Sequence, residues 1–467
     1  MYGLTIAQAR KKLDNKEISA VELTKASLQR LQSLDKKLNA FLTVTEETAL
    51  ESAKKADERI KNGDSTPLLG IPFSLKDMYL TKGIRTTAGS KVLEDYIPQY
   101  SSTVVEKLET AGAVLIGKNN QDAWAHGSSG ENSDFGSTTN PWNTELVPGG
   151  SSSGPAVAVA AGIAPFSMGT DTGGSIRQPA ALTNIVGLKP TYGRVSRYGT
   201  IAMASSFDTM GHFTKTVEDS AMVLSVTAGK DAKDATSSPK PIDAYTKDID
   251  TSIKGLKIGM PKEYFIDGMD EKVKEATMSA IKKLEELGAE IVEISLPHTQ
   301  YAIDIYYVLQ TAEVSSNLAR YDGIRYGNTR EFFGDEAKRR IMLGTFVLAH
   351  GYYDAYYKRA MKIRTLIKQD FEKAFEKVDV IATPASPTTA WKIGEKVDDP
   401  LAMYLSDVFT VTGNVAGIPG LSVPAGFVKN LPVGMQLLGP MFGEKLLFQV
   451  GRQYELATKW YEKEPNL

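Results

Sequence analysis

The sequence predicts an α/β protein in which helices cover a sheet, and three observations support that prediction. Helix-like and strand-like segments alternate, first over residues 104–118 and again over residues 271–295. Such alternation is typical of layered α/β folds. The chain has 467 residues, long enough to bury a large core without cross-links. It has no cysteine, which excludes disulfides, thiolate metal sites and a cysteine nucleophile.

The first 65 residues are expected to form a helical layer. Ser19 followed by Glu22 is a capping-box pattern, because the serine oxygen can accept a backbone N–H while the glutamate reaches back to the serine. Apolar residues then recur at helical spacing, at Val21, Leu28, Leu31 and Leu34. Residues 68–78, LLGIPFSLKDM, are an apolar run that ends in charge, which indicates a strand entering a loop.

The later elements follow from the same patterns. Residues 104–118 predict a helix, a turn at Gly112 and a strand, and residues 271–295 repeat this order around Gly288. Thr216 and Asp219 are placed to cap a helix that Gly229 would end. Residues 229–256 are polar and carry proline, so a surface excursion is expected there, and a long helical stretch is expected over residues 335–378.

Composition excludes several classes of function. The net charge of −2 is too balanced for nucleic-acid binding through bulk charge. Residues 155–166 are too short an apolar run to span a bilayer, and the N-terminus lacks the pattern of a signal peptide, so a soluble cytoplasmic protein is expected. No metal site is expected, because the histidines show no two-ligand spacing. They are His126, His212, His298 and His350.

Two glycine-rich loops are the strongest chemical feature. They are PGGSSSG, residues 148–154, and GTDTGGSIRQPA, residues 169–180. The alanine-rich stretch between them is expected to form a helix and a strand that bring both loops to one end of the layer. The backbone N–H groups of residues 172–175 suit a nest for an oxyanion, with Ser175 as nucleophile. Helix-capping turns would explain the same composition equally well.

Two other motif matches fail. Residues 150–154 satisfy G-x-S-x-G, but Pro148 and two glycines precede them where that motif needs a strand. Residues 112–118 do not form a phosphate loop, because Asn119 stands where a serine or threonine should hold magnesium. A serine nucleophile also needs a base. Lys76 is the candidate, since burial behind an apolar run would lower its pKa and leave it neutral.

Taken together, Lys76, GGSSSG and DTGGSIRQPA resemble the amidase signature family, with spacings of 75 residues from Lys76 to Ser151 and 24 from Ser151 to Ser175. The resemblance implies a Ser–cis-Ser–Lys unit in which Ser175 is the nucleophile, Ser151 a bridging serine held by a cis peptide, and Lys76 the base. The oxyanion would rest on the backbone N–H groups of Thr172, Gly173, Gly174 and Ser175. The family fold implies one domain over residues 1–467, with α/β/α layers around a large mixed sheet.

The C-terminal segments narrow the resemblance. Residues 338–375, 399–427 and 431–448 are similar to one branch, the A subunits of the glutamyl-tRNA(Gln)/aspartyl-tRNA(Asn) amidotransferases. In that branch Arg340 and Asp407 would hold free glutamine, since arginine matches a carboxylate and aspartate an ammonium. The sequence departs from the branch at His126, where methionine is usual, and at Ser153, where glycine is usual.

This branch implies a function. The chain would hydrolyse L-glutamine through an acyl-enzyme and pass the ammonia to a partner, within a heterotrimer completed by the B and C subunits. ATP and Mg²⁺ would be used by the partner, Glu-tRNA(Gln) would be reached only through it, and this chain would need no cofactor. Two alternatives stay open, namely a stand-alone amidase for small amides and a scaffold protein whose site has lapsed.

Overall fold

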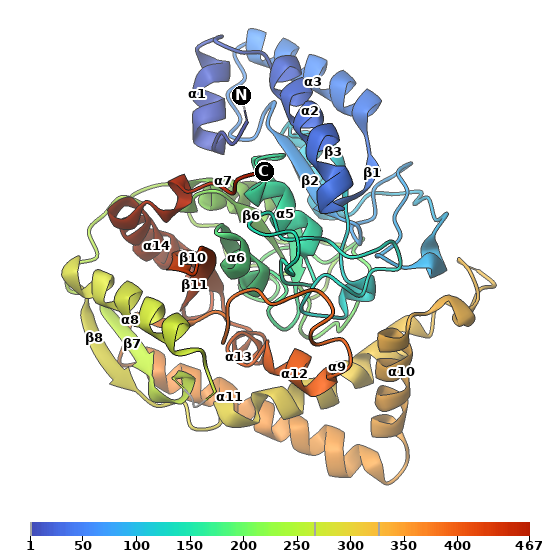
Figure 1. Ribbon diagram of the computed structural model, residues 1–467, viewed down its shortest axis with the longest axis vertical. Helices are drawn as coiled ribbons and strands as arrows, with labels where there is room; N and C mark the ends of the chain where they lie inside the picture. Colours follow the sequence, from blue (N-terminus) through green and yellow to red (C-terminus); the bar gives the residue numbers. More distant parts are fainter. Residues whose placement is uncertain (1, 266–267, 326) are drawn as a thin grey trace.

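One mixed sheet organises the chain in this computed structural model, which describes residues 2–265, 268–325 and 327–467 (Figure 1). Its eleven strands are ordered β1-β3-β2-β4-β6-β5-β10-β11-β9-β7-β8. They are β1 (Phe41–Val44), β2 (Pro72–Lys76), β3 (Val114–Asn119), β4 (Phe166–Asp171), β5 (Val186–Lys189), β6 (Thr209–Thr214), β7 (Lys257–Pro261), β8 (Glu290–Ile294), β9 (Val380–Pro384), β10 (Gly420–Val428) and β11 (Leu431–Leu438). The predicted α/β fold with a large mixed sheet is therefore confirmed.

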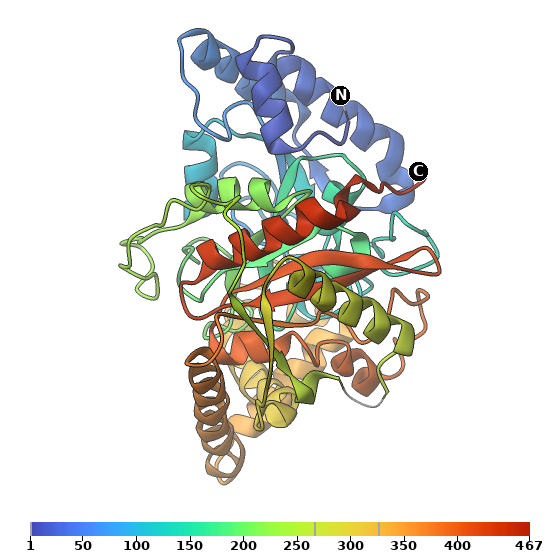
Figure 2. The same cartoon turned by 90° about the vertical axis from the view of Figure 1, so that its left-hand side faces the viewer.

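Helices cover this sheet. The α-helices are α1 (Ile6–Asp14), α2 (Ala20–Leu38), α3 (Glu46–Lys61), α4 (Thr103–Thr110), α5 (Ser153–Ala160), α6 (Arg177–Thr183), α7 (Val217–Thr227), α8 (Glu271–Glu286), α9 (Ala302–Leu318), α10 (Asp335–Leu348), α11 (Arg359–Phe375), α12 (Pro400–Leu405), α13 (Val411–Ala416) and α14 (Glu444–Thr458). In Figure 2, α8 and α14 lie on the side that faces the viewer. No helix in the described ranges has the length and apolar character needed to cross a bilayer.

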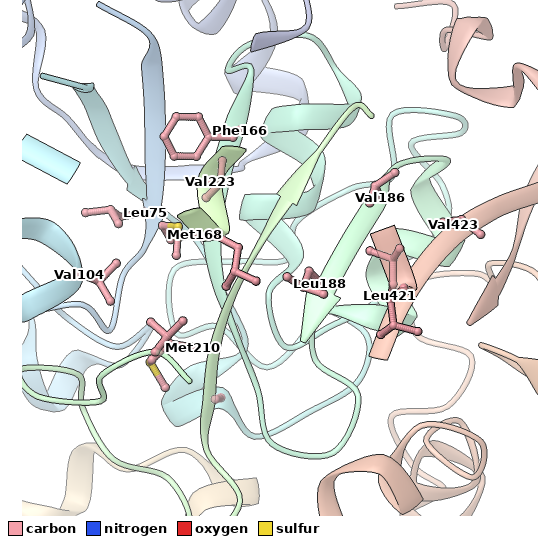
Figure 3. Packing of buried hydrophobic residues seen from close by; sticks show 14 of the residues in the cluster. Leu75, Val104, Phe166, Met168, Val186, Leu188, Met210, Val223, Leu421 and Val423 are labelled. Carbon is pink, nitrogen blue, oxygen red and sulfur yellow. The ribbon is translucent and has the colours of Figure 1, made fainter. Parts of the chain in front are cut away.

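Adjacent residues of β6 show that both faces of the sheet are covered. Side chains alternate between the two faces along a strand. Phe213 packs in a cluster with Ile176 and Ala180 at α6, whereas His212 contacts Ser220 of α7. The larger core lies on the α7 side, where Leu75, Phe166, Met168 and Val223 belong to one buried cluster (Figure 3).

The direction of two strands places the catalytic loops. β2 and β4 are parallel neighbours, with Phe73 opposite Phe166 and Leu75 opposite Met168. Parallel strands end at the same edge of a sheet. Lys76, the last residue of β2, and the glycine-rich loop after Asp171, the last residue of β4, therefore meet at that edge.

Most predicted elements are present. The capping box of Ser19 and Glu22 starts α2, residues 104–118 form α4 and β3, and residues 271–295 form α8 and β8. The helix capped by Thr216 is α7. Residues 230–256 form neither helix nor strand, and Tyr245, Ile249 and Ile253 anchor this excursion to the body.

Two predictions need correction. The N-terminal layer is not wholly helical, because β1 pairs antiparallel with β3 at the sheet edge. A strand of four residues is too short to give a periodic signal. The long helix over residues 335–378 is interrupted between α10 and α11 by Gly351, whose φ of +87° lies outside helical space, and by a π-helical turn (Tyr353–Lys358).

Candidate active site

Lys76 lies fully buried at the end of β2, surrounded by hydroxyl groups. Its Nζ is 2.7 Å from Ser151 Oγ, 3.0 Å from Ser152 Oγ and 2.9 Å from Thr170 Oγ1. A neutral amine has two N–H donors and one lone pair, so it can donate to two of these hydroxyls and accept a proton from the third. The geometry with Ser151 is therefore suitable for proton transfer.

Burial also prepares Lys76 for that role. Loss of hydration lowers the pKa of Lys76 to about 7, although the charges of Asp122, Asp171 and Asp208 act in the opposite direction. An ordinary lysine is almost completely protonated at neutral pH. About half of the Lys76 side chains are therefore neutral near pH 7.

Ser151 lies in the first glycine-rich loop, just before α5. The Gly150–Ser151 peptide bond is cis, as the resemblance implied. The N–H of Asp122 donates to the Ser151 carbonyl at 3.2 Å, and the N–H of Gly150 donates to Gln178 Oε1 at 3.1 Å. No strand directly precedes this loop in the described chain, in agreement with the rejection of a nucleophile elbow.

Ser175 lies in the second loop, between β4 and α6. The two loops are joined by a hydrogen bond from the Ser152 N–H to the Ser175 carbonyl at 3.2 Å. Ser175 is 7% exposed, whereas Lys76 and Ser151 are 0% exposed. Of the three predicted catalytic residues, Ser175 is thus the one that a substrate from solution can reach.

The loop of residues 172–175 presents its backbone inward. None of its four N–H groups donates a hydrogen bond to another group within the described ranges, so all remain available to an oxyanion. Its carbonyl and hydroxyl groups are instead held from outside. Thr410 Oγ1 donates to the Gly173 carbonyl at 2.8 Å, and Thr172 Oγ1 donates to Asp208 at 2.8 Å.

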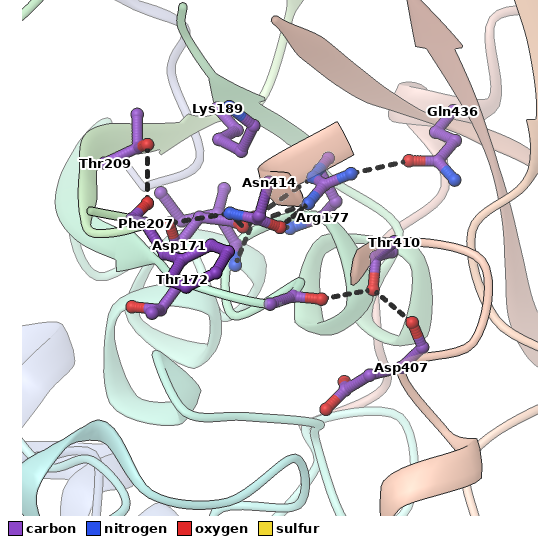
Figure 4. Close-up of polar contacts among 12 residues, drawn as sticks. Asp171, Thr172, Arg177, Lys189, Phe207, Thr209, Asp407, Thr410, Asn414 and Gln436 are labelled. Carbon is purple, nitrogen blue, oxygen red and sulfur yellow. Dashed lines mark hydrogen bonds and ion pairs between the residues drawn. The ribbon is translucent and has the colours of Figure 1, made fainter. Parts of the chain in front are cut away.

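A buried ion pair supports this loop from below (Figure 4). Arg177 forms two contacts with the Asp171 carboxylate, at 3.0 and 3.1 Å. Arg177 also donates to Asn414 and Gln436, at 2.6 and 3.0 Å. Burial alone would raise the pKa of Asp171, but the Arg177 charge outweighs it and holds that pKa below its usual value. The same carboxylate accepts the N–H groups of Ile176 and Arg177, which fixes the turn after Ser175.

Arg340 projects from α10 and is only 3% exposed. Its Nε lies 2.7 Å from Glu336 Oε1, and its guanidinium lies 5.3 and 5.8 Å from the ring centres of Tyr307 and Tyr404. Its two terminal nitrogens have no hydrogen bond to the described part of the chain. They are therefore free for the bidentate contact that a carboxylate makes.

Asp407 reaches the same region through Ser128. Ser128 Oγ donates to Asp407 Oδ2 at 2.7 Å. Burial raises the pKa of Asp407 to about 7, against the opposing effects of the Ser128 hydrogen bond and the Arg340 charge. Ser128 and Arg340 both line one cavity of about 280 Å³.

This cavity is tied directly to the catalytic loops. Gln178, which accepts the Gly150 N–H, also donates to the Ser128 carbonyl at 2.8 Å. Thr410, which holds Gly173, donates its own N–H to the Asp407 carbonyl at 3.0 Å. The structure therefore brings the predicted catalytic residues and the predicted substrate-binding residues into one hydrogen-bonded assembly.

Several residues of this assembly were not predicted from the sequence. Thr170 and Arg177 stand inside the quoted motif, and Glu336 stands four residues before Arg340, so their proximity was readable. Ser128 had no such signal. His126 is buried without a hydrogen-bond partner for either ring nitrogen among the described residues, and burial lowers its pKa well below the usual value. The described residues contain no cluster of three or more acidic or histidine side chains suited to a metal.

The chain belongs to the amidase family, because the model of that family matches residues 22–448. Its similarity to one kind of amidase extends over the whole chain, namely to the A subunits of the glutamyl-tRNA(Gln) amidotransferases. It is 54% identical to the one from Geobacter metallireducens, with 100% of each chain covered. It is 53% identical to the one from Coxiella burnetii, again over 100% of both chains.

Solved structures agree. Among crystal structures of such A subunits, the glutamyl-tRNA(Gln) amidotransferase protein of Thermotoga maritima has a TM-score of 0.83 and 42% identity, covering 97% of this chain and 94% of that one. The peptide amidase of Stenotrophomonas maltophilia has a TM-score of 0.86 at 31% identity, with 99% and 98% covered. The fold is thus common to several amidases, while the sequence is nearer to the amidotransferase proteins.

Proposed function

We propose that this chain is the glutaminase component of a tRNA-dependent amidotransferase. It hydrolyses L-glutamine and supplies ammonia for the conversion of Glu-tRNA(Gln) to Gln-tRNA(Gln), and of Asp-tRNA(Asn) to Asn-tRNA(Asn) where the complex serves both. The observation that carries the proposal is the cavity in which Arg340 and the Ser128–Asp407 pair lie beside the catalytic loops. The full-length similarity to the A subunits of glutamyl-tRNA(Gln) amidotransferases supports it.

Glutamine binds through both ends of its amino-acid group. Its α-carboxylate contacts the free terminal nitrogens of Arg340, and its α-ammonium lies near the Asp407 carboxylate. The side-chain amide then lies over Ser175. Because both charged groups of the substrate are recognised, the site favours an amino acid over a simple amide.

The reaction uses the serine–serine–lysine unit. Ser175 Oγ attacks the amide carbon while its proton passes to Ser151 Oγ, and the proton of Ser151 passes to neutral Lys76. The oxyanion accepts hydrogen bonds from the N–H groups of residues 172–175. The returning proton goes to the leaving nitrogen, which departs as ammonia, and water then releases glutamate from Ser175.

The ammonia is passed to a partner. In the proposed complex, the B and C subunits complete a heterotrimer in the cytoplasm, and the first of these uses ATP and Mg²⁺ to activate the misacylated tRNA. This chain then requires no cofactor of its own and meets tRNA only through that partner.

An exposed apolar surface supports the existence of a partner. Along α10 and the segment after it, at the lower right of Figure 1, Met342 is 73% exposed and Phe346 is 48% exposed. The Phe346 ring lies 4.1 Å from that of Tyr352, and the Tyr352 ring lies 6.0 Å from that of Tyr356. Contiguous exposed aromatic and methionine side chains are typical of protein interfaces.

A stand-alone amidase for small amides is the second candidate. The similarity in fold to the peptide amidase of Stenotrophomonas maltophilia favours it. Such an enzyme would have no dependence on Arg340 and no obligate partner.

Ammonia release separates the two candidates. The purified chain is assayed with L-glutamine, L-asparagine and propionamide, with Ser175→Ala as the blank. We expect a preference for glutamine and a loss of several orders of magnitude in Ser175→Ala. Arg340→Ala should lose glutamine hydrolysis and retain most hydrolysis of propionamide. Equal losses on both substrates would contradict the carboxylate role of Arg340, and wild-type preference for propionamide would favour the stand-alone amidase.

A further inference from the structure

Glu336 lies between two arginines at the substrate cavity. Its Oε1 contacts Arg340 Nε at 2.7 Å, and its other oxygen pairs with a terminal nitrogen of Arg339. The Tyr404 hydroxyl also donates to Oε1, at 3.3 Å. The Glu336 side chain is 14% exposed and lines the cavity together with both arginines. It is therefore held at a fixed position beside the point where the substrate carboxylate would bind.

The charge of this trio has a direct consequence. Two guanidinium groups and one carboxylate give a net charge of +1, which one substrate carboxylate neutralises. Without the Glu336 charge, the same place would carry +2. Charges separated by a few ångströms at a largely buried site interact strongly enough to change affinity about tenfold. The excess positive charge would then oppose the α-ammonium of glutamine.

We propose that Glu336 is a specificity-determining residue, which adjusts the cavity to accept a zwitterion in preference to a simple anion. This inference rests on the proposed function, because it assumes that glutamine binds between Arg340 and Asp407. Glu336 acts in two ways: it occupies Nε of Arg340, so that only the terminal nitrogens face the substrate, and it limits the positive potential felt by the ammonium group.

Glu336→Gln tests the charge with little change of shape. The glutamine oxygen can still accept from Arg340 and Tyr404, whereas the negative charge is gone. The two substrates compared are L-glutamine and glutaramate, which is glutamine without its amino group. We expect the ratio of kcat/KM for L-glutamine to that for glutaramate to fall about tenfold in the variant. Propionamide hydrolysis, measured in each preparation, gives the amount of working catalytic centre.

Asp335→Asn is the matched control. It removes the same charge one residue earlier on α10 at the lining of the same cavity, and Asp335 forms no ion pair within the described ranges. Its substrate ratio should stay within about twofold of the wild-type value, since an exposed unpaired charge has a small effect. Greater exposure of Asp335 to solvent is the reason for this difference.

The outcomes separate the two proposals. If the wild type prefers L-glutamine over propionamide but Glu336→Gln leaves the ratio unchanged, the role of Glu336 is wrong and the proposed function stands. A fall of the same size in Asp335→Asn would also overturn the role of Glu336. If the wild type does not prefer L-glutamine, the proposed function itself fails and this inference fails with it.

Discussion

The pH dependence of hydrolysis should differ between glutamine and a neutral amide. Burial lowers the pKa of Lys76 to about 7 and raises the pKa of Asp407 to about 7. Lys76 must be neutral to accept the proton from Ser151, which every substrate requires. Asp407 must be negative only for a substrate that carries an ammonium group. Propionamide therefore depends on one deprotonation, and L-glutamine depends on two.

The expected size follows from these values. One pH unit below its pKa, a group is deprotonated in about one molecule in eleven. From about pH 8 down to about pH 6, kcat/KM for propionamide should therefore fall about tenfold. For L-glutamine the two fractions multiply, so its kcat/KM should fall about a hundredfold over the same range. The preference for L-glutamine should thus decrease about tenfold as the pH falls.

The assay is ammonia release at constant ionic strength between about pH 5.5 and about pH 8.5, with kcat/KM measured for both substrates. Asp407→Asn is the control, since it removes the second titration. Its L-glutamine profile, although lower, should have the shallow slope of the propionamide profile. This comparison separates the titration of Asp407 from that of Lys76.

Two results would refute the reasoning. Parallel profiles for the two substrates in the wild type would mean that Asp407 does not recognise the ammonium group. A flat propionamide profile would mean that the protonation of Lys76 does not limit the reaction.

Two further substitutions test the support of the oxyanion loop. Arg177→Met leaves the buried Asp171 charge without its cation and should lower the free energy of unfolding by about 3–5 kcal/mol; chemical denaturation measures this, and a loss below about 1 kcal/mol would contradict it. Gly174→Ala places a methyl group 2.1 Å from Thr410 Oγ1 at a φ of +145°, so the loop must shift. We expect kcat to fall at least about tenfold with a smaller change in KM; steady-state kinetics that leave kcat unchanged would be inconsistent with an oxyanion role for this loop.

The fold was predictable because its signals are local. The capping box at Ser19 and the helix–glycine–strand order at Gly112 and Gly288 each lie within a short stretch of the chain. Those signals specify elements, and alternation of elements specifies an α/β architecture. The strand β1 was missed because a strand of four residues depends on pairing with β3, which the local sequence does not encode.

The site was predictable only in part, because many of its contacts join distant segments. Ser128 and Asp407 are 279 residues apart, and Arg177 and Gln436 are 259 apart. No periodicity connects such residues, so Ser128 and Gln436 gave no signal. Lys76 could be proposed because a serine nucleophile needs a base, and Arg340 and Asp407 because their motifs resemble one branch of a family.

The supporting network also bears on the chemistry of Lys76. Burial favours the neutral amine, but the negative charge of Asp171 favours the ammonium form. Arg177 lies directly on Asp171 and opposes that charge. Without it, the Asp171 carboxylate would stabilise protonated Lys76 more strongly and remove the base that Ser151 needs. The ion pair under the oxyanion loop therefore has two effects: it fixes the turn after Ser175, and it keeps the electrostatic environment of Lys76 compatible with a neutral amine near pH 7.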